Sequence, residues 1–290
     1  MRDNFLAFAV ELEQREWGLL QFLLFSLPAM STKQIKSCID LGLVQVDQKI
    51  CKISSSRLQL GQVIKVYLSF FERRKSFIRP MEILIEKEHF LLCNKPIGIS
   101  STEENFFRIL KQPVYLVHRL DKETSGIILL GKSPIAKEKL EGLFRKRAVT
   151  KKYVAIVEGL WQKKEGKLEG FFQKKKQLLG QSIWSGKAEQ GLPGITFFQI
   201  VQKNLSTTLL LLHPYTGRTH QLRVQLSEAG FPVLGDSQYR GTIISPRMFL
   251  HAYELSFQDP FTKEVICHKA PIPKEFKEIT GVIDGKNFIC

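Results

Sequence analysis

The chain has 290 residues, with 43 Lys and Arg side chains against 28 Asp and Glu, so its formal net charge at pH 7 is +15. So large a positive excess favours a polyanionic partner, either a nucleic acid or an acidic membrane surface. No apolar run reaches the roughly 18 residues that a membrane-spanning helix needs, and no signal-peptide pattern opens the chain. We therefore expect a cytoplasmic protein without membrane spans, long enough for one large domain or two smaller ones.

The cysteines and histidines show no metal-binding spacing. The five cysteines are odd in number and scattered, which favours reduced thiols over a disulfide framework. The six histidines are equally dispersed. We therefore predict no metal site.

The first part of the chain has the pattern of two short helices. Residues 1–16 are weakly patterned, and we interpret them as an N-terminal extension that caps the first domain. Between Trp17 and Pro28, leucines recur at helical spacing and the proline ends the run. Ser31 stands three residues before Gln34, which is the capping box that begins a second helix.

Short apolar runs at residues 43–46, 50–53 and 63–68 then predict strands. Two short helices followed by short strands, with basic residues on one side, resemble the S-four type of RNA-binding domain over residues 17–75. The resemblance implies RNA binding, although a small α+β domain with a solvated basic face would have the same charge pattern. The basic residues of this segment are Lys33, Lys36, Lys49, Lys52, Arg57, Lys65, Arg73, Arg74 and Lys75, against Asp40, Asp47 and Glu72.

A basic linker separates this domain from the rest of the chain. Residues 70–80 include Arg73, Arg74 and Lys75, whose mutual repulsion extends the backbone. We place the second domain at residues 76–290, and it opens with apolar runs that predict two strands and a turn. The runs are residues 83–85 and 90–92, and the turn is Asn94-Lys95-Pro96-Ile97-Gly98.

A polar segment at residues 118–126, His-Arg-Leu-Asp-Lys-Glu-Thr-Ser-Gly, lies between apolar runs at 114–117 and 127–130. Such a segment presents chemistry at the edge of a sheet, and its carboxylate is Asp121. A charged loop with a structural ion pair would have the same sequence, so the rest of the chain has to distinguish the two. Ser133-Pro134 then predicts the start of a helix, with proline at its first position.

A β-rich run at residues 151–159 leads into a long basic insertion at residues 160–192. Basic side chains interleaved with aromatic ones suit a loop that grips nucleic acid, because charges bind phosphates and rings stack on bases. A solvated hairpin with its own aromatic cluster fits equally well, and both interpretations stay open. The residues concerned are Lys163, Lys164, Lys167, Lys174, Lys175, Lys176 and Lys187, with Trp161, Phe171, Phe172 and Trp184.

The last part of the domain contains a cation in an unusual place. After strands at residues 195–201 and 207–212, an apolar stripe predicts a helix that begins near Arg218. A cation at a helix N-terminus opposes the helix dipole, so we expect an anion beside it, with Asp121 as the candidate. Two further strands, joined by a turn at Asp259-Pro260, are expected in the tail.

Several of these segments together resemble the RluA-type pseudouridine synthases. The long blocks are residues 118–126, 151–159 and 213–236, and the short ones are Asn94–Gly98 and Phe249–Phe257, all in order between about residues 78 and 275. Five ordered blocks are far more specific than any single motif. The resemblance implies an α+β fold with a mixed, largely antiparallel central sheet and flanking helices, and an S-four-like domain in front is usual for several members.

The resemblance also assigns roles to residues. It implies that Asp121 is the catalytic aspartate and that Tyr153 stacks on the target base. Arg218 would pair with Asp121 and hold it ionised. Arg119 would help to open the RNA or contact the displaced strand, and Leu222 would line the pocket beside the base. We expect His118, His220 and His251 to be structural.

The implied reaction explains the residue types. Converting uridine to pseudouridine breaks a glycosidic C–N bond and makes a C–C bond without a redox change, so we expect no cofactor. A carboxylate can act as a nucleophile at the sugar or the uracil, or as a base that removes the ribose 2′ proton, and the sequence does not choose among these. The detached uracil requires a close, water-poor pocket with an aromatic wall.

The sequence therefore predicts a monomeric RNA pseudouridine synthase. Ribosomal RNA, in particular that of the large subunit, is the favoured substrate by analogy, and transfer RNA is the alternative. A base-excising glycosylase would also use an aspartate and a flipped base. A non-catalytic RNA-binding or ribosome-assembly factor is the third possibility, against which an intact set of Asp121, Tyr153 and Arg218 argues.

Overall fold

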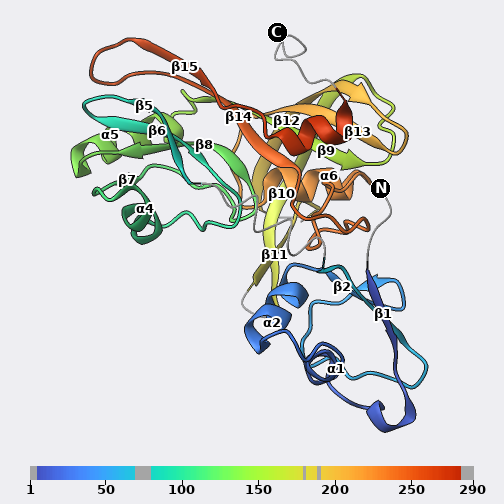
Figure 1. Cartoon of the computed structure of the whole chain (residues 1–290). Helices are drawn as coiled ribbons and strands as arrows, with labels where there is room; N and C mark the ends of the chain where they lie inside the picture. The colour runs from blue at the N-terminus through green and yellow to red at the C-terminus, as the bar shows by residue number, and fades with distance from the viewer. Residues whose placement is uncertain (1–4, 69–79, 179–180, 188–190, 282–290) are drawn as a thin grey trace.

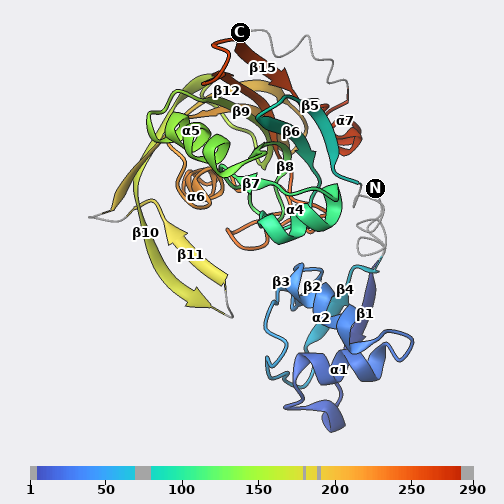
Figure 2. The same ribbon diagram turned by 90° about the vertical axis from the view of Figure 1, so that its left-hand side faces the viewer.

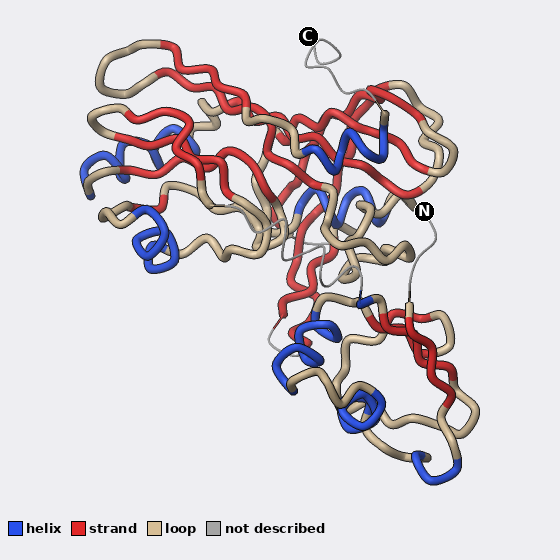
Figure 3. Tube along the Cα trace, viewed as in Figure 1, coloured by secondary structure: helices blue, strands red, loops and turns tan. Residues whose placement is uncertain are grey.

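The computed structural model describes residues 5–68, 80–178, 181–187 and 191–281. Figures 1 and 2 show a small N-terminal domain beside a larger body. Strands run through the whole of the larger body, with helices placed around them (Figure 3). The linker predicted at residues 70–80 lies, except for its last residue, outside the described residues.

The small domain is built on a four-stranded antiparallel sheet in the order β1-β4-β2-β3. β1 pairs with β4, so that Leu6 lies opposite Val66, and Val10 is buried in the domain core. Residues 6–10 therefore belong to this domain, which corrects their interpretation as an extension ahead of it. The elements are β1 (Leu6–Ala9), η1 (Leu12–Gln14), α1 (Leu19–Ser26), α2 (Thr32–Asp40), β2 (Val44–Val46), β3 (Lys49–Ile50) and β4 (Val63–Val66).

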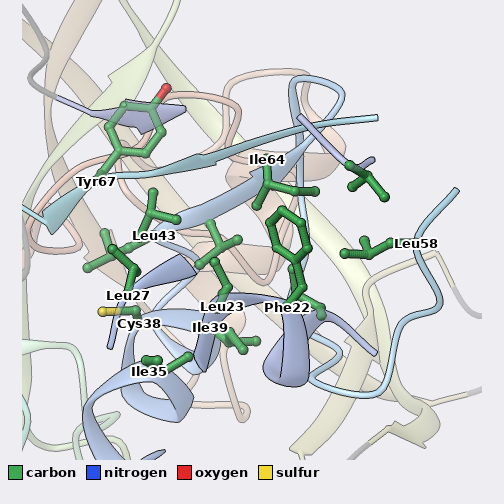
Figure 4. Close-up of a cluster of buried hydrophobic side chains, with 14 residues drawn as sticks. Phe22, Leu23, Leu27, Ile35, Cys38, Ile39, Leu43, Leu58, Ile64 and Tyr67 are labelled. Atoms are coloured by element: carbon green, nitrogen blue, oxygen red, sulfur yellow. The ribbon is translucent and has the colours of Figure 1, made fainter. Parts of the chain in front are cut away.

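The two helices cover one face of this sheet and bury their apolar side chains against it. The predicted capping box is confirmed, since Ser31 Oγ accepts from the Gln34 amide at 3.3 Å and Gln34 Oε1 accepts from the Ser31 amide at 2.8 Å. Phe22 and Ile39 are among the side chains that fill the space between helices and strands in Figure 4. The domain thus has a core of its own.

The larger body is one long sheet in the order β11-β10-β12-β13-β9-β14-β8-β6-β5, with β15 paired to β14 and β7 paired to β8. β14 and β8 are parallel, whereas the other strand pairs are antiparallel, so the predicted mixed, largely antiparallel α+β fold is confirmed. The strands are β5 (Glu82–Glu86), β6 (Phe90–Lys95), β7 (Tyr115–Leu116), β8 (Ser125–Gly131), β9 (Thr150–Glu158), β10 (Glu165–Leu178), β11 (Gln181–Ser185), β12 (Leu192–Lys203), β13 (Thr207–Pro214), β14 (Leu250–Gln258) and β15 (Val265–Lys269).

Four helices of the described chain accompany this sheet, namely α4 (Glu103–Leu110), α5 (Pro134–Arg145), α6 (Gln221–Glu228) and α7 (Lys274–Thr280). α5 begins as predicted, with Ser133 Oγ accepting from the Ala136 amide at 3.1 Å. α6 differs from an ordinary surface helix because every residue from Gln221 to Ser227 is buried. A charged residue on such a helix requires a partner, and α6 carries Arg223.

The basic insertion is a β-hairpin. β10 continues from its pairing with β12 into a pairing with β11, with a register irregularity between Lys174 and Lys176. Figure 2 shows the distal part of β10 and β11 projecting from the sheet. No helix in the described part of the chain is long and apolar enough to cross a membrane.

Candidate active site

Asp121 lies in the loop between β7 and β8, four residues before β8 begins at Ser125. The Thr124 amide donates to the Asp121 carbonyl at 3.1 Å, and the Gly98 amide donates to the Lys122 carbonyl at 2.8 Å. The backbone is thereby fixed on both sides of the carboxylate, whose side chain is 26% exposed. Asp121 is thus held in place and still accessible.

A glycine at the start of β8 permits the close packing that supports this loop. Gly126 has φ +113°, and a Cβ added there would stand 2.2 Å from the Ala252 carbonyl oxygen on β14. Any other residue would be strained and would also clash with backbone atoms. The end of the polar segment is therefore locked between β8 and β14.

The partner of Asp121 is Arg223, on the buried helix α6. Arg223 Nη1 donates to Asp121 Oδ2 at 2.9 Å, and the same guanidinium donates to both carboxylate oxygens of Asp236 at 2.6 and 2.9 Å. Gln238 Oε1 accepts a further bond at 2.8 Å. With all three guanidinium nitrogens engaged, Arg223 holds the Asp121 carboxylate in one orientation.

The expected pairing of Arg218 with Asp121 is wrong in the structure. α6 begins at Gln221, so Arg218 precedes the helix, and its backbone amide donates to Gln221 Oε1 at 3.0 Å. Its side chain turns to β12, where Nε donates to the Pro193 carbonyl at 3.0 Å. Because Arg218 lies outside the helix, the dipole of α6 does not require an anion beside it.

The Arg223–Asp236 pair stays ionised although it is buried. Burial alone would raise the pKa of Asp236, but the Arg223 charge and hydrogen bonds, with the amides of Gln238 and Tyr239, bring it below its usual value. Burial would lower the pKa of Arg223, and the charges of Asp236 and Asp121 outweigh this and raise it. The ring of Tyr239 covers the guanidinium carbon at 4.9 Å.

His220, which we expected to be structural, lies beside Asp121. Its Nε2 is 3.8 Å from Asp121 Oδ1, and its Nδ1 is 2.8 Å from the hydroxyl of Tyr239. Burial lowers the pKa of His220 below its usual value, in spite of the opposing effect of Asp121. His220 is therefore neutral at pH 7, and Arg223 is the cation that contacts Asp121.

Tyr153 and Leu222 belong to one hydrophobic cluster, and Leu222 directly precedes Arg223 on α6. Tyr153 is on β9, opposite Leu212 of β13 and Ala252 of β14, and is partly buried against the cluster that contains Leu222. Burial raises the pKa of Tyr153, and the charge of Asp121 raises it further. The phenol is therefore neutral, and its ring is part of an apolar wall within electrostatic reach of the carboxylate.

The remaining predicted residue, Arg119, is exposed two positions before Asp121, and its charge acts on His220.

His118 is structural, as expected. Its Nε2 accepts from the Leu129 amide at 2.9 Å, and its ring stacks on Phe144. Burial lowers the pKa of His118 to about 3, so it carries no charge at pH 7.

With this geometry in view, comparison with known proteins identifies the family. Residues 83–228 match the family described as RNA pseudouridylate synthase. The chain belongs to this family. It is an isomerase that acts on uridines in RNA.

Relatives match this pseudouridylate synthase over most of its length. The ribosomal large subunit pseudouridine synthase C of Pasteurella multocida is 35% identical, over 70% of this chain and 68% of that protein. The protein of the same name from Salmonella typhi is 30% identical, over 91% of this chain and 92% of that protein. The second match therefore includes most of the small domain.

Solved structures of RNA pseudouridylate synthase domains also resemble this chain. Human RNA pseudouridylate synthase domain containing 1 has a TM-score of 0.57 and 28% identity, covering 66% of this chain and 83% of that one. Human RNA pseudouridylate synthase domain containing 4 shares the fold, with a TM-score of 0.56 and 24% identity over 73% of this chain and 95% of that one.

Sequence reasoning missed several residues around Asp121 in this synthase. Arg223 and Asp236 could have been suspected as opposite charges in otherwise apolar segments. Lys95 gave no signal, yet it is fully buried and donates to the carbonyls of Pro96, Ile99 and Lys122 at 2.9, 3.0 and 3.3 Å. Burial lowers its pKa to about 7. Lys95 thereby ties the turn after β6 to the Asp121 loop.

The described residues hold no group of three His, Cys, Asp or Glu side chains that could bind a metal ion. The site combines the accessible carboxylate of Asp121, a guanidinium whose three nitrogens all donate hydrogen bonds, a neutral imidazole and an apolar wall with one aromatic ring. Such a set can hold an uncharged planar base against a carboxylate.

Proposed function

We propose that this protein converts specific uridines of large-subunit ribosomal RNA to pseudouridine, with Asp121 as the catalytic residue. The observation that carries the proposal is the fixed, accessible Asp121 carboxylate beside Tyr153, held by Arg223 and Asp236. Ribosomal RNA is preferred to transfer RNA because the relatives from Pasteurella multocida and Salmonella typhi are named as large-subunit ribosomal synthases. We propose that the enzyme acts in the cytoplasm as a monomer.

The reaction is an isomerisation in which atoms balance within one nucleotide. The bond between N1 of uracil and C1′ of ribose breaks, the uracil turns, and C5 bonds to C1′. C5 then loses its hydrogen as a proton, and N1 gains one. The detached uracil never leaves the pocket, which is what separates this enzyme from a glycosylase.

The geometry favours one oxygen of Asp121 for the chemistry. Oδ2 accepts the Arg223 bond, whereas Oδ1 is directed toward His220 at 3.8 Å. Oδ1 is therefore the atom we assign to the covalent or proton-transfer step, whether it attacks the sugar or the uracil or removes the 2′ proton. Because Arg223 fixes the other oxygen, the reactive lone pair points in one direction.

The other residues bind the nucleotide. Tyr153 stacks on the uracil and Leu222 lines the pocket beside it, which keeps water from the detached base. Arg119, exposed at the rim, contacts the RNA strand that is displaced when the uridine is flipped, a step that requires a few kcal/mol. The Arg218 side chain is directed to β12 and not to Asp121, so the role that remains for it is binding a phosphate of the RNA.

The substitution Tyr153→Ala tests the stacking role. Loss of a base-stacking ring corresponds to about 1–3 kcal/mol, so we expect roughly a 10- to 100-fold lower kcat/KM. Tyr153→Phe retains the ring and should stay close to wild type. Tritium release from RNA labelled at C5 of uridine measures both, and equal losses in the two variants would mean that the hydroxyl matters instead of the ring.

RNA binding should depend steeply on salt. For roughly five phosphate contacts, raising the salt from about 50 to about 200 mM should weaken binding about a hundredfold. Filter binding of a large-subunit RNA fragment measures this dependence. A flat response would contradict the assignment of the positive surface to RNA.

The substrate class is tested with two transcripts made in vitro, which contain no pseudouridine. Large-subunit ribosomal RNA should release tritium at a defined number of sites, and pooled transfer RNA should release none. Activity on transfer RNA alone would overturn the ribosomal assignment. Appearance of free uracil would identify a glycosylase, and RNA binding without either product would identify an assembly factor.

A further inference from the structure

The small domain contacts the larger body at the turn that holds Arg223. Ser237 directly follows Asp236, and its hydroxyl donates to the Leu41 carbonyl of the small domain at 3.4 Å. A Cβ placed on Gly42 would stand 2.6 Å from Ser237 Cβ, so the two backbones approach closely. Ile244, a little further along the same loop, packs against the core of the small domain. In Figures 1 and 2 the end of the small domain that carries β2 faces the larger body.

Lys52, just after β3, is at this contact. Its Cε lies 3.1 Å from the position that a Cβ of Gly42 would take, and the side chain is half-buried. Asp236, Arg223 and Glu123 all act electrostatically on its ammonium. Among residues 5–68, 80–178, 181–187 and 191–281, no carboxylate forms a salt bridge with it and no atom accepts a hydrogen bond from it.

Withdrawing an ammonium from water costs free energy unless an anion lies beside it and balances its charge. Burial lowers the pKa of Lys52, and Asp236, the next largest influence, raises it. Asp236 does not supply the missing anion. Within the described residues its ion pair is with Arg223, and Oδ1 also accepts from the amides of Gln238 and Tyr239. The contact between the two domains, here called the seam, thus holds a lysine ammonium without a paired anion. Asp236, which acts on this ammonium, shares Arg223 with Asp121.

We propose that Lys52 is a substrate-binding residue of the synthase, whose ammonium contacts the RNA phosphate next to the target uridine at the seam between the two domains. This inference rests on the proposed function and deepens it. The small domain then does more than tether RNA, because it contributes one residue to the site that selects the uridine. The anion is a backbone phosphate, since RNA supplies one on each side of every flipped nucleotide.

The test uses a synthetic RNA fragment that carries a mapped target uridine, with or without a neutral methylphosphonate at the adjacent phosphate. Lys52→Gln should lower kcat/KM about tenfold on the normal fragment, as expected for one charge-assisted hydrogen bond. The methylphosphonate should lower kcat/KM of the wild type to the same extent and have no further effect on Lys52→Gln. Lys52→Arg should retain most of the activity.

Lys36→Gln is the matched control, because Lys36 is an exposed lysine on α2 of the same domain. Its effect should be additive with that of the methylphosphonate. Additive losses for Lys52→Gln as well would overturn the proposal and leave Lys52 as a general contributor to positive charge. A lower melting temperature for Lys52→Gln, with the full methylphosphonate effect retained, would assign it to the domain contact alone.

A second pair of variants tests the docked arrangement. Ile244→Glu places a charge against the small-domain core and should reproduce both the tenfold loss and the insensitivity to methylphosphonate. Ile243→Glu changes the neighbouring exposed residue and should behave as wild type. Activity of the wild type and its loss in Asp121→Asn establish the proposed function separately. If the wild type is active and Ile244→Glu is equally active, the role of the seam is refuted and the proposed function stands.

Discussion

Asp121→Asn should abolish tritium release from RNA labelled at C5 of uridine, with a rate at least about 10³-fold below wild type. The substitution keeps the size of the side chain and removes the charged oxygen that we assign to the chemistry. It also leaves Arg223 with Asp236 and Gln238, so the buried network stays closed. Binding of the RNA should change little, because phosphate contacts dominate affinity.

The neighbouring carboxylate provides the control for Asp121. Glu123 stands in the same turn, and Glu123→Gln makes the same chemical change two residues away. That variant should retain most of the activity. If Asp121→Asn kept its activity while Glu123→Gln lost it, the catalytic role would belong to Glu123.

Arg223→Ala should have the second largest effect, on both folding and catalysis. It leaves Asp236 buried with no cation, and breaking a buried pair in this way costs about 3–5 kcal/mol of folding free energy. It also frees Asp121 from its 2.9 Å contact, so the surviving folded enzyme should be nearly inactive. Urea denaturation and single-turnover tritium release measure the two effects.

Two further variants separate charge from geometry at this position. Arg223→Lys keeps the charge but not the planar fork that binds Asp236 and Asp121 together, so most of the activity should still be lost. Arg218→Ala should leave stability near that of the wild type, since the Arg218 guanidinium bonds a carbonyl at the edge of β12. A larger loss in Arg218→Ala than in Arg223→Ala would contradict the pairing seen in the structure.

Local patterns in the sequence predicted local structure well. The capping box at Ser31 and the start of α5 at Ser133 depend only on residues a few positions apart, and both are confirmed. The fold class and the family followed from ordered blocks rather than from periodicity. Asp121 was found because its polar segment interrupts two strongly apolar runs.

The partners of Asp121 could not be predicted in the same way, because they depend on long-range packing. Choosing Arg223 over Arg218 required knowing where α6 begins. The helix begins at Gln221, whose Oε1 accepts from the Arg218 amide and from the Thr216 hydroxyl, so that Arg218 stays outside it. Lys95 reaches the Asp121 loop only because β6 lies beside β8. Periodicity within one element contains no information about such neighbours.

The N-terminal strand shows the same limit. β1 has a short, mostly exposed pattern, and its place in the small domain depends on pairing with β4, far along the chain. The contact of the small domain with Ser237 is likewise beyond any local pattern. The structure adds these long-range relations to what the sequence predicts.

The most direct test is a map of pseudouridines in large-subunit ribosomal RNA from cells that lack this protein. Particular pseudouridines should be absent from these cells. They should return when the wild-type gene is restored and stay absent with a gene that encodes Asp121→Asn. An unchanged map in the deletion strain, or full restoration by Asp121→Asn, would contradict the central claim that Asp121 isomerises uridines of this RNA.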